Sequence, residues 1–278
     1  MNKINSVKQN TDILEKSRKK SLYLSSLLPL WYKKLYKELV TVLERYNYAV
    51  EILEDTKDIW IRDFMPIYHN GKFYSYNYNP NYLQEDKQYL TNPIPVLKKL
   101  GIKTEHIDLV LDGGNLVFHA DTIVMTDKVY SENPKLCNDK EKLKSYFHMF
   151  EKVIVIPRDP DDEEIYGHAD GMVRFIDKNH LLVNSYTSLF RSNLLDALKE
   201  QGMKYTELEM KENTRYSWGY INFIQLDDLI IQPSIDKVND LHIQVQLRKL
   251  YPCVAIELVD AKLLTKKGGV FNCISWEC

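Results

Sequence analysis

The chain has 278 residues, of which 44% are hydrophobic and 27% are charged, and its formal net charge is −2. This composition is typical of a soluble globular protein, and the length allows a substantial core in one large domain or two ordinary ones. The balanced charge excludes the clustered basic excess of a nucleic-acid-binding protein, and no run approaches the roughly 18 apolar residues of a membrane span.

The N-terminal segment, residues 1–20, is polar and rich in lysine, and it lacks the apolar core of a secretory signal. We expect this segment to be partly mobile, because a polar terminus has little to pack against a core. The remaining residues, 21–278, are predicted to fold as one unit.

Five segments share one plan, in which a glycine or polar loop leads into a short strand, a tight turn and a second strand. They cover residues 60–76, 113–126, 167–185 and 219–233, and the fifth opens at Gly268 and is cut short by the C-terminus. The turns contain residues that tolerate tight-turn geometry, such as Asn70-Gly71 in the first segment and Asp227-Asp228 in the fourth.

The intervals between these hairpins carry apolar residues at helical spacing. Helices are predicted over residues 30–46, 136–150, 192–201 and 239–250. A short apolar strand is predicted after each of them, at residues 49–53, 153–156, 204–208 and 254–258.

Polar residues at matching places in the hairpins recur at steps of about 50 to 55 residues, a period typical of arrays and propellers. These residues are Asp63, Asn115, Asp170, Asn222 and Asn272. A unit of hairpin, helix and strand used about five times predicts an α/β ring, with helices outside and the hairpin-opening loops facing a central axis. An ordinary α/β fold also alternates helices and strands, and it stays open as the alternative.

Such a ring would bring a cysteine, a histidine and two carboxylates from distant loops to one point. The four residues are Cys273, His168, Asp63 and Asp170. A Cys–His pair serves nucleophilic catalysis, but a set with two carboxylates fits no common hydrolase order. Positions i and i+2 of a strand point the same way, so His168 and Asp170 are expected to enter one pocket together.

Two carboxylates in one cleft repel each other unless a cation lies between them, and a planar guanidinium with five N–H donors fits that need. The predicted substrate therefore carries an arginine-like head. Cys273 as thiolate would attack the guanidinium carbon, and His168 would protonate the departing amine and then activate water. These steps need no metal and no organic cofactor.

The remaining cysteines and the acidic run have simpler interpretations. Cys137, Cys253 and Cys278 show neither CxxC spacing nor neighbouring histidines, so the sequence predicts neither a zinc site nor disulfides, and free thiols favour a cytoplasmic location. The acidic run at residues 159–164 is either a solvated loop or a surface for a cationic substrate tail.

The chain resembles the agmatine deiminase and bacterial peptidylarginine deiminase family, because the family's motifs occur in order over residues 23–278. They are W-x-R-D-x-x-P at 60–66, a glycine motif at 112–115, G-H-x-D-x-x-x-R-F at 167–175, Y-x-N-F at 220–223 and a segment at 259–262 before the terminal cysteine. The resemblance implies the pentein fold, a five-bladed α/β propeller with pseudo-fivefold ββαβ-type repeats around a central active site. Residues 21–278 would then form a single pentein catalytic domain.

The resemblance also implies roles for individual residues. Cys273 would be the nucleophile, His168 the acid and base, and Asp63 and Asp170 the guanidinium ligands. The implied substrate-binding set is Trp60 as a wall of the pocket, Asn222 as a polar contact, and Asn115, Asp112 and Arg174. Asn115 and Asp112 have a second interpretation as turn-capping residues.

The implied activity is hydrolytic deimination of a small guanidine, most simply agmatine to N-carbamoylputrescine and ammonia, a step of putrescine biosynthesis. Alternatives are deimination of free or peptidyl arginine to citrulline, amidinotransfer, and a non-catalytic binder of arginine-like ligands. The expected partner is a small guanidine or an arginyl peptide, with no nucleic acid or membrane; the oligomeric state stays open.

Three features depart from the agmatine deiminase pattern. Asn272 stands where those enzymes usually have His, Asp112 stands where they usually have Glu, and the chain ends five residues after Cys273. The four central groups are intact, so deimination is predicted to survive, while the identity of the substrate stays open.

Overall fold

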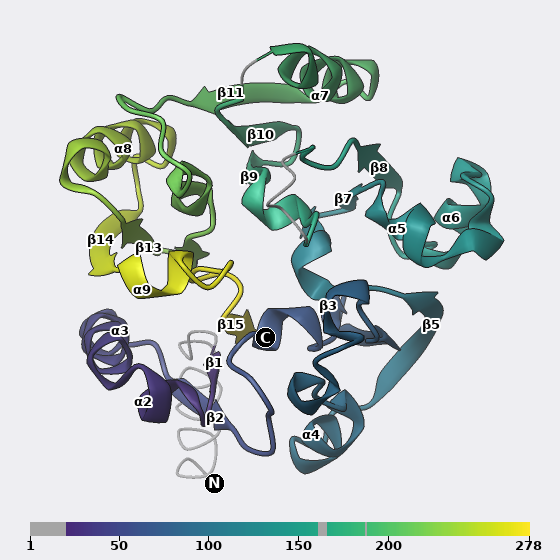
Figure 1. Cartoon of the computed structure of the whole chain (residues 1–278), viewed down its shortest axis with the longest axis horizontal. Coiled ribbons are helices and arrows are strands. Elements are labelled where there is room, and N and C mark those ends of the chain that lie inside the picture. Colours follow the sequence, from purple (N-terminus) through teal and green to yellow (C-terminus); the bar gives the residue numbers. More distant parts are fainter. Residues whose placement is uncertain (1–20, 161–165, 187) are drawn as a thin grey trace, which may run out of the picture.

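The computed structural model describes residues 21–160, 166–186 and 188–278 as an α/β arrangement of small sheets with helices toward the periphery (Figure 1). The segment expected to be mobile, residues 1–20, and the acidic residues 161–164 lie outside the described residues. Within the described residues, no helix has the length and apolar character to cross a bilayer.

The strands are β1 (Leu22–Ser25), β2 (Val50–Leu53), β3 (Ile67–His69), β4 (Lys72–Asn77), β5 (Thr104–Val110), β6 (Val117–His119), β7 (Thr122–Thr126), β8 (Lys152–Ile156), β9 (Val173–Asp177), β10 (His180–Asn184), β11 (Lys204–Leu208), β12 (Ile224–Gln225), β13 (Leu229–Ser234), β14 (Ala255–Asp260) and β15 (Ser275–Glu277). The α-helices are α2 (Leu28–Trp31), α3 (Lys33–Arg45), α4 (Pro93–Lys99), α5 (Lys128–Glu132), α6 (Lys140–Tyr146), α7 (Ser188–Glu200), α8 (Lys237–Leu250) and α9 (Lys262–Thr265). The 3₁₀ turns that bear on function are η1 (Ile61–Asp63), η2 (Asn81–Leu83), η4 (Gly113–Asn115), η6 (Ala169–Gly171) and η7 (Ser217–Ile221).

The described strands form five three-stranded sheets, and in each sheet the middle strand is antiparallel to one neighbour and parallel to the other. Four sheets use strands that follow one another in the chain: β3-β4-β5, β6-β7-β8, β9-β10-β11 and β12-β13-β14. The remaining sheet has the order β15-β1-β2, with Tyr23 opposite Trp276. The last segment, expected to be cut short, is therefore completed by a strand from the other end of the chain.

The predicted hairpins are present, and their turns show why. Asn70 and Gly71 both have positive φ, 48° and 79°, as a two-residue turn between twisted strands requires. Ala120 between β6 and β7 also has a positive φ, 46°. The turn residues therefore specified where β3–β4 and β6–β7 fold back.

The predicted helices are present with shifted ends. Helix α3 buries Leu35, Leu39, Val42 and Leu43 on one face, as its spacing predicts. The helix predicted over 136–150 is much shorter, because positive φ values at Cys137 and Asn138 interrupt the helical backbone before α6. The side chain of Asp139 then caps α6 by accepting hydrogen bonds from the first-turn N–H groups.

Helix α4 and strand β5 lie in an interval where the sequence interpretation placed no element. The start of α4 has two signals in the sequence. Asn92 precedes the helix, where its side chain accepts from the N–H of Ile94, and a proline occupies the first helical position. A second proline two residues later obscured the helical pattern.

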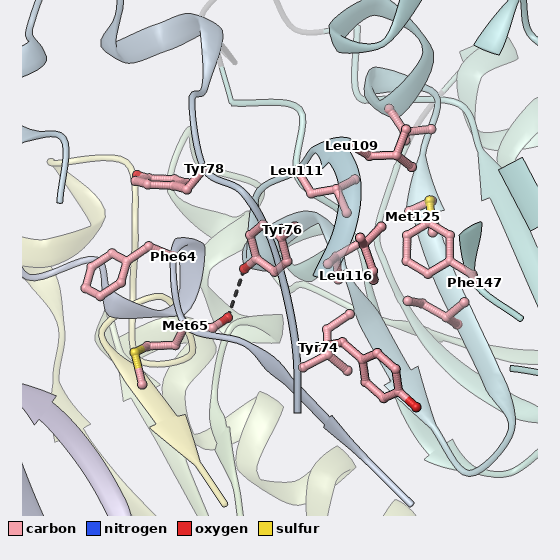
Figure 2. Packing of buried hydrophobic residues seen from close by; sticks show 14 of the residues in the cluster. Phe64, Met65, Tyr74, Tyr76, Tyr78, Leu109, Leu111, Leu116, Met125 and Phe147 are labelled. Atoms are coloured by element: carbon pink, nitrogen blue, oxygen red, sulfur yellow. Dashed lines mark hydrogen bonds between the residues drawn. The ribbon is translucent and has the colours of Figure 1, made fainter. Parts of the chain in front are cut away.

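The core of the β3-β4-β5 sheet holds the turn that carries Asp63. Tyr76 on β4 is buried among apolar side chains, and its hydroxyl donates hydrogen bonds to the backbone oxygens of Asp63 and Met65, both at 2.9 Å (Figure 2). A buried tyrosine hydroxyl needs such partners, so β4 and η1 are fixed to each other. The turns in turn contact one another, η1 with η4, η4 with η6 and η6 with η7, while β15 contacts η1.

Candidate active site

Four short turns supply the candidate site, and each precedes a strand at the edge of its sheet. Asp63 ends η1, Asp170 lies in η6, and Asn222 follows η7. His168 directly precedes η6, and Cys273 lies just before β15. The predicted strand geometry for His168 and Asp170 is wrong, because Asp170 is part of a 3₁₀ turn; both residues nevertheless lie in the same site.

The backbone on both sides of His168 is fixed by β7 and η4. The hydroxyl of Thr126 donates to the carbonyl oxygen of Gly167 at 2.6 Å. The side-chain oxygen of Asn115 accepts from the N–H of Ala169 at 3.2 Å and from the N–H and hydroxyl of Thr126, both at 2.9 Å. Asn115, predicted to bind substrate, is thus buried and engaged with backbone that holds His168 in place.

Gly114 allows His168 and Asp63 to approach each other. A Cβ atom at Gly114 would lie 2.5 Å from Nδ1 of His168 and 2.8 Å from Oδ1 of Asp63, closer than real Cβ atoms come. The N–H of Gly114 donates to Oδ1 of Asp63 at 3.1 Å. The second glycine of the 112–115 motif is therefore needed for space as well as for a hydrogen bond.

The imidazole of His168 lies between two carboxylates. Its Nε2 is 3.1 Å from Oδ2 of Asp112, and its Nδ1 is 3.7 Å from Oδ1 of Asp63. Burial alone would lower the pKa of His168, but Asp63 and Asp112 outweigh burial and raise this pKa to about 9. Burial raises the pKa of Asp63 to about 6, against the opposing effect of His168.

Asp112 is fully enclosed and is held as a carboxylate by two cations. Its Oδ2 accepts from Lys128 Nζ and from His168 Nε2. Burial pushes the pKa of Asp112 up, but His168 and Lys128 together bring it below its ordinary value. Asp112, predicted to bind substrate, therefore contacts the imidazole of His168 at Nε2, whereas Asp63 lies near Nδ1.

The thiol of Cys273 faces an amide and a carboxylate. Its Sγ is 3.4 Å from the side-chain oxygen of Asn222 and 3.5 Å from Oδ2 of Asp170, and its N–H donates to the same Asn222 oxygen at 3.4 Å. Burial raises the pKa of the Cys273 thiol well above its ordinary value, and the charges of Asp170 and Asp63 raise it further. Burial and these charges therefore favour the neutral thiol over the thiolate.

Asn272 and Arg174 lie behind Asp170. The amide of Asn272 donates to Oδ2 of Asp170 at 2.7 Å and accepts from Arg174 Nη1 at 2.8 Å. Arg174 also donates to the carbonyl oxygen of Phe223 at 2.6 Å. Arg174, predicted to bind substrate, therefore reaches the site through Asn272 and does not line the cavity.

A cavity of about 320 Å³ leads to His168. Its walls include the rings of Tyr166 and Trp218, and Arg215, Lys266 and Lys267 lie around it with Asp159. Cys273 is 8% exposed and is not among the lining residues. Trp60, predicted as a wall, packs against Gly269, where the ring occupies the space that a Cβ atom would need.

Four residues that bear on the site were missed from the sequence: Tyr82, Lys128, Tyr166 and Trp218. The hydroxyl of Tyr82 donates to Oδ2 of Asp63 at 2.8 Å, and Tyr166 packs against Gly268. Trp218 and Tyr166 adjoin recognised motifs, which was a usable signal, whereas Tyr82 and Lys128 stand in segments with no such pattern. Among the described residues, no group of His, Cys, Asp or Glu side chains is arranged to hold a metal ion.

Known proteins with similar sequences and structures include several deiminases. A protein of Photobacterium profundum provisionally named agmatine deiminase is 23% identical, over 81% of this chain and 76% of its own length. The agmatine deiminase of Pseudomonas aeruginosa is 22% identical, over 82% of this chain and 75% of its own length. A solved cysteine-to-serine variant of C. jejuni agmatine deiminase with substrate bound is 24% identical, with a TM-score of 0.75 over 94% of this chain and 93% of that one.

The model of one protein family spans most of the chain, including every residue of the site described above. It is the model of the Porphyromonas-type peptidyl-arginine deiminases, and it matches residues 32–278. The chain therefore belongs to the Porphyromonas-type peptidyl-arginine deiminase family, whose members are hydrolases that act on amidine groups.

Proposed function

We propose that the chain deiminates a guanidine group through a covalent thiouronium intermediate on Cys273. The observation that carries the proposal is the convergence of a thiol, an imidazole and two carboxylates from three separate turns, in a chain of a deiminase family. The pKa of His168 near 9 makes it an acid at neutral pH, as departure of ammonia requires.

The two carboxylates, Asp63 and Asp170, would hold the guanidinium by charge-assisted hydrogen bonds. Both of these charges raise the pKa of the Cys273 thiol in the empty site, so a bound cation that neutralises them favours ionisation of the thiol. The substrate thus helps to generate its own nucleophile.

In the first half of the reaction the thiolate attacks the guanidinium carbon and forms a neutral tetrahedral adduct. His168 gives its proton to one amino group of the adduct, the C–N bond breaks, and ammonia leaves. In the second half, neutral His168 takes a proton from water while the hydroxide adds to the thiouronium carbon. Breaking of the C–S bond then releases a ureido product and returns the thiol.

Agmatine is the simplest substrate on this proposal, with N-carbamoylputrescine and ammonia as products, because the relatives named above are agmatine deiminases. A second candidate is free arginine, giving citrulline. It is favoured by the cations Arg215, Lys266 and Lys267 around the cavity, which suit a substrate carboxylate. The acidic residues 161–164, proposed to hold a cationic tail, follow the lining residue Asp159 in the chain and lie outside the described residues.

We infer further that the five sheets are the blades of a closed pentein propeller and that residues 21–278 form one catalytic domain. The pairing of β15 with β1, which joins the two ends of the chain in one sheet, supports the inference. So do the successive contacts between η1, η4, η6 and η7. The free state of all four cysteines supports the predicted cytoplasmic location.

The test is release of ammonia from agmatine, free arginine and an arginyl peptide by the purified full chain. Turnover of one of these, with trapping of a Cys273 adduct in a quenched reaction, is the expected result. Release of no ammonia from any guanidine would sink the enzymatic proposal and favour a non-catalytic binder. Product containing an amine in place of water would identify an amidinotransferase.

A further inference from the structure

Behind the imidazole of His168 lies a buried ion cluster made by Asp112, Lys128 and Glu132. The ammonium of Lys128, 1% exposed, bonds to the carboxylate of Asp112 and to Oε1 of Glu132 at 2.7 Å. Burial lowers the pKa of Lys128, but the two carboxylates outweigh burial and raise the pKa above its ordinary value, so the ammonium stays charged. Buried lysines are uncommon unless they are paired, so the cluster calls for an explanation.

The two carboxylate oxygens of Asp112 differ in their hydrogen bonds. Its Oδ2 accepts from both Lys128 and His168, whereas its Oδ1 is buried without a hydrogen-bond partner in the described residues. Without Lys128, the carboxylate would have His168 as its one remaining partner. The side chain of aspartate is one methylene shorter than that of glutamate, and Lys128 fixes where this short carboxylate lies.

Lys128 also reaches the other carboxylate beside His168, by an indirect route. Its ammonium lies 5.4 Å from the centre of the Tyr82 ring, and its partner Glu132 accepts from the N–H of Asn81 at 3.3 Å. The hydroxyl of Tyr82 in turn donates to Asp63. One ammonium therefore anchors both supports of the imidazole.

We propose that Lys128 is a positioning residue for catalysis, which holds Asp112 against Nε2 of His168 so that Nδ1 is the nitrogen that exchanges protons with the substrate. The inference rests on the proposed deimination. Nδ1 lies 3.7 Å from Oδ1 of Asp63, which is too far for a hydrogen bond, so Asp63 does not commit that nitrogen. Nε2, in contrast, is committed to Asp112 at 3.1 Å.

The charge of Lys128 has a second consequence for His168. Among the described residues, the charged or titratable groups around the imidazole include Asp63, Asp112, Lys128, Tyr82 and Tyr166. Among these, the ammonium is the cation, and it opposes the two carboxylates that raise the pKa of His168. Without it, the imidazolium would hold its proton more tightly and would be slower to give that proton to the departing amino group.

The test is Lys128→Met in the full chain, with the imidazole of His168 followed by ¹⁵N NMR and assigned with His168→Asn. We expect the pKa of His168 to rise by about one unit. Above that pKa, the wild-type ring should keep its proton on Nε2, whereas the variant should move part of it to Nδ1. With the best guanidine substrate, kcat should fall about tenfold to a hundredfold, with little change in KM.

The matched control is Lys135→Met, which removes an ammonium paired with Asp108 on the surface, where it is 46% exposed. This control should leave the His168 pKa, tautomer and kcat at wild-type values. Unchanged values in Lys128→Met would overturn the proposal. Because the NMR readout needs no turnover, a wild-type chain without deiminase activity would refute the proposed function and still leave the positioning role open to measurement.

A buried unpaired carboxylate could prevent Lys128→Met from folding, so a second pair of variants carries the same test. Asp112→Asn removes that carboxylate and leaves Lys128 paired with Glu132, and Asp112→Asn with Lys128→Met and Glu132→Gln leaves no buried unpaired charge in the cluster. If Lys128 acts through Asp112, the tautomer of His168 should be the same in these two proteins. A further change of tautomer on loss of Lys128 would show that it does not act through Asp112.

Discussion

The two sides of the candidate site are built from different groups. The imidazole side carries full charges, with Asp63 and Asp112 against His168 and Lys128 behind them. The thiol side carries one carboxylate, Asp170, together with two amides: Asn222 contacts Sγ of Cys273, and Asn272 donates to Asp170.

This difference favours a protonated His168 together with a neutral Cys273 thiol. It does not favour a thiolate–imidazolium pair that exists before the substrate binds. Carboxylates raise the pKa of His168 to about 9, which favours the imidazolium at neutral pH. Burial raises the pKa of Cys273 well above its ordinary value, and Asp170 and Asp63 raise it further, which favours the neutral thiol. In the proposed mechanism, His168 is therefore ready to protonate the departing amino group, whereas ionisation of the thiol is favoured by the bound substrate cation.

Removal of the thiol has the largest expected effect, because both halves of the reaction need it. Cys273→Ala should lower kcat by at least about 10⁴-fold in an ammonia-release assay, while the guanidine still binds. The control is Cys278→Ala, which removes another incompletely exposed thiol and should turn over normally. Persistent activity in Cys273→Ala would mean that the nucleophile is misassigned.

Exchange of an amide for a charge would break the difference between the two sides. Asn222→Asp places a carboxylate 3.4 Å from Sγ with almost no change of shape. The thiol pKa should rise further, and kcat/KM should fall about a hundredfold, as the free enzyme must lose more to ionise the thiol. The measurement is the rate of Cys273 alkylation against pH.

The control for that exchange is Asn184→Asp on β10, a buried amide that donates to the backbone of Gly171. It also buries a new carboxylate, so it should lower stability, but the pH dependence of Cys273 alkylation should match the wild type. Equal alkylation profiles for all three proteins would refute the idea that the neutral amide at 222 keeps the pKa of the Cys273 thiol from rising further.

The pH profile tests the imidazole side. With its pKa raised to about 9, His168 is protonated below that pH and loses its proton above it. As general acid it should therefore give a kcat/KM that falls about tenfold per pH unit above pH 9. This decline of kcat/KM should be measured by fixed-time ammonia assays at a series of pH values. Its midpoint should move to higher pH in Lys128→Met. A midpoint near the ordinary pKa of histidine would contradict the idea that Asp63 and Asp112 raise the pKa of His168.

Part of the fold followed from local rules. Asn70-Gly71 placed the first hairpin because those residues accept positive φ, and the spacing of Leu35, Leu39 and Leu43 predicted one face of α3. The pairing of β15 with β1 could not be predicted in that way, because it joins residues from opposite ends of the chain.

The candidate site divides in the same manner. The motifs identified Cys273 and His168, which the structure places with carboxylates and amides as neighbours. Their surroundings depend on contacts between distant segments, such as Arg174 with Asn272 and Tyr82 with Asp63. No local sequence pattern indicates such contacts. Arg174 was therefore predicted to bind substrate, and Tyr82 and Lys128 were not recognised as residues of the site.

Asn272 offers the smallest effect and the finest test of the amide side. Asn272→Ala removes the donor to Oδ2 of Asp170 and leaves Arg174 without its partner there. Asp170 should then be held less firmly as a guanidinium ligand, so KM should rise about tenfold while kcat changes little, as one charge-assisted hydrogen bond is lost. Steady-state kinetics with the guanidine substrate measure the two constants separately.

Asn272→Asp separates orientation from charge at the same position. The new carboxylate still accepts from Arg174, but it cannot donate to Asp170 and it repels that carboxylate across 2.7 Å. The KM of Asn272→Asp should therefore differ from the KM of Asn272→Ala. The added anion attracts the guanidinium, whereas its repulsion of Asp170 displaces a ligand of that guanidinium. If both variants kept the wild-type KM, Asp170 would be held by contacts other than Asn272, and of the two amides only Asn222 would bear on the reaction.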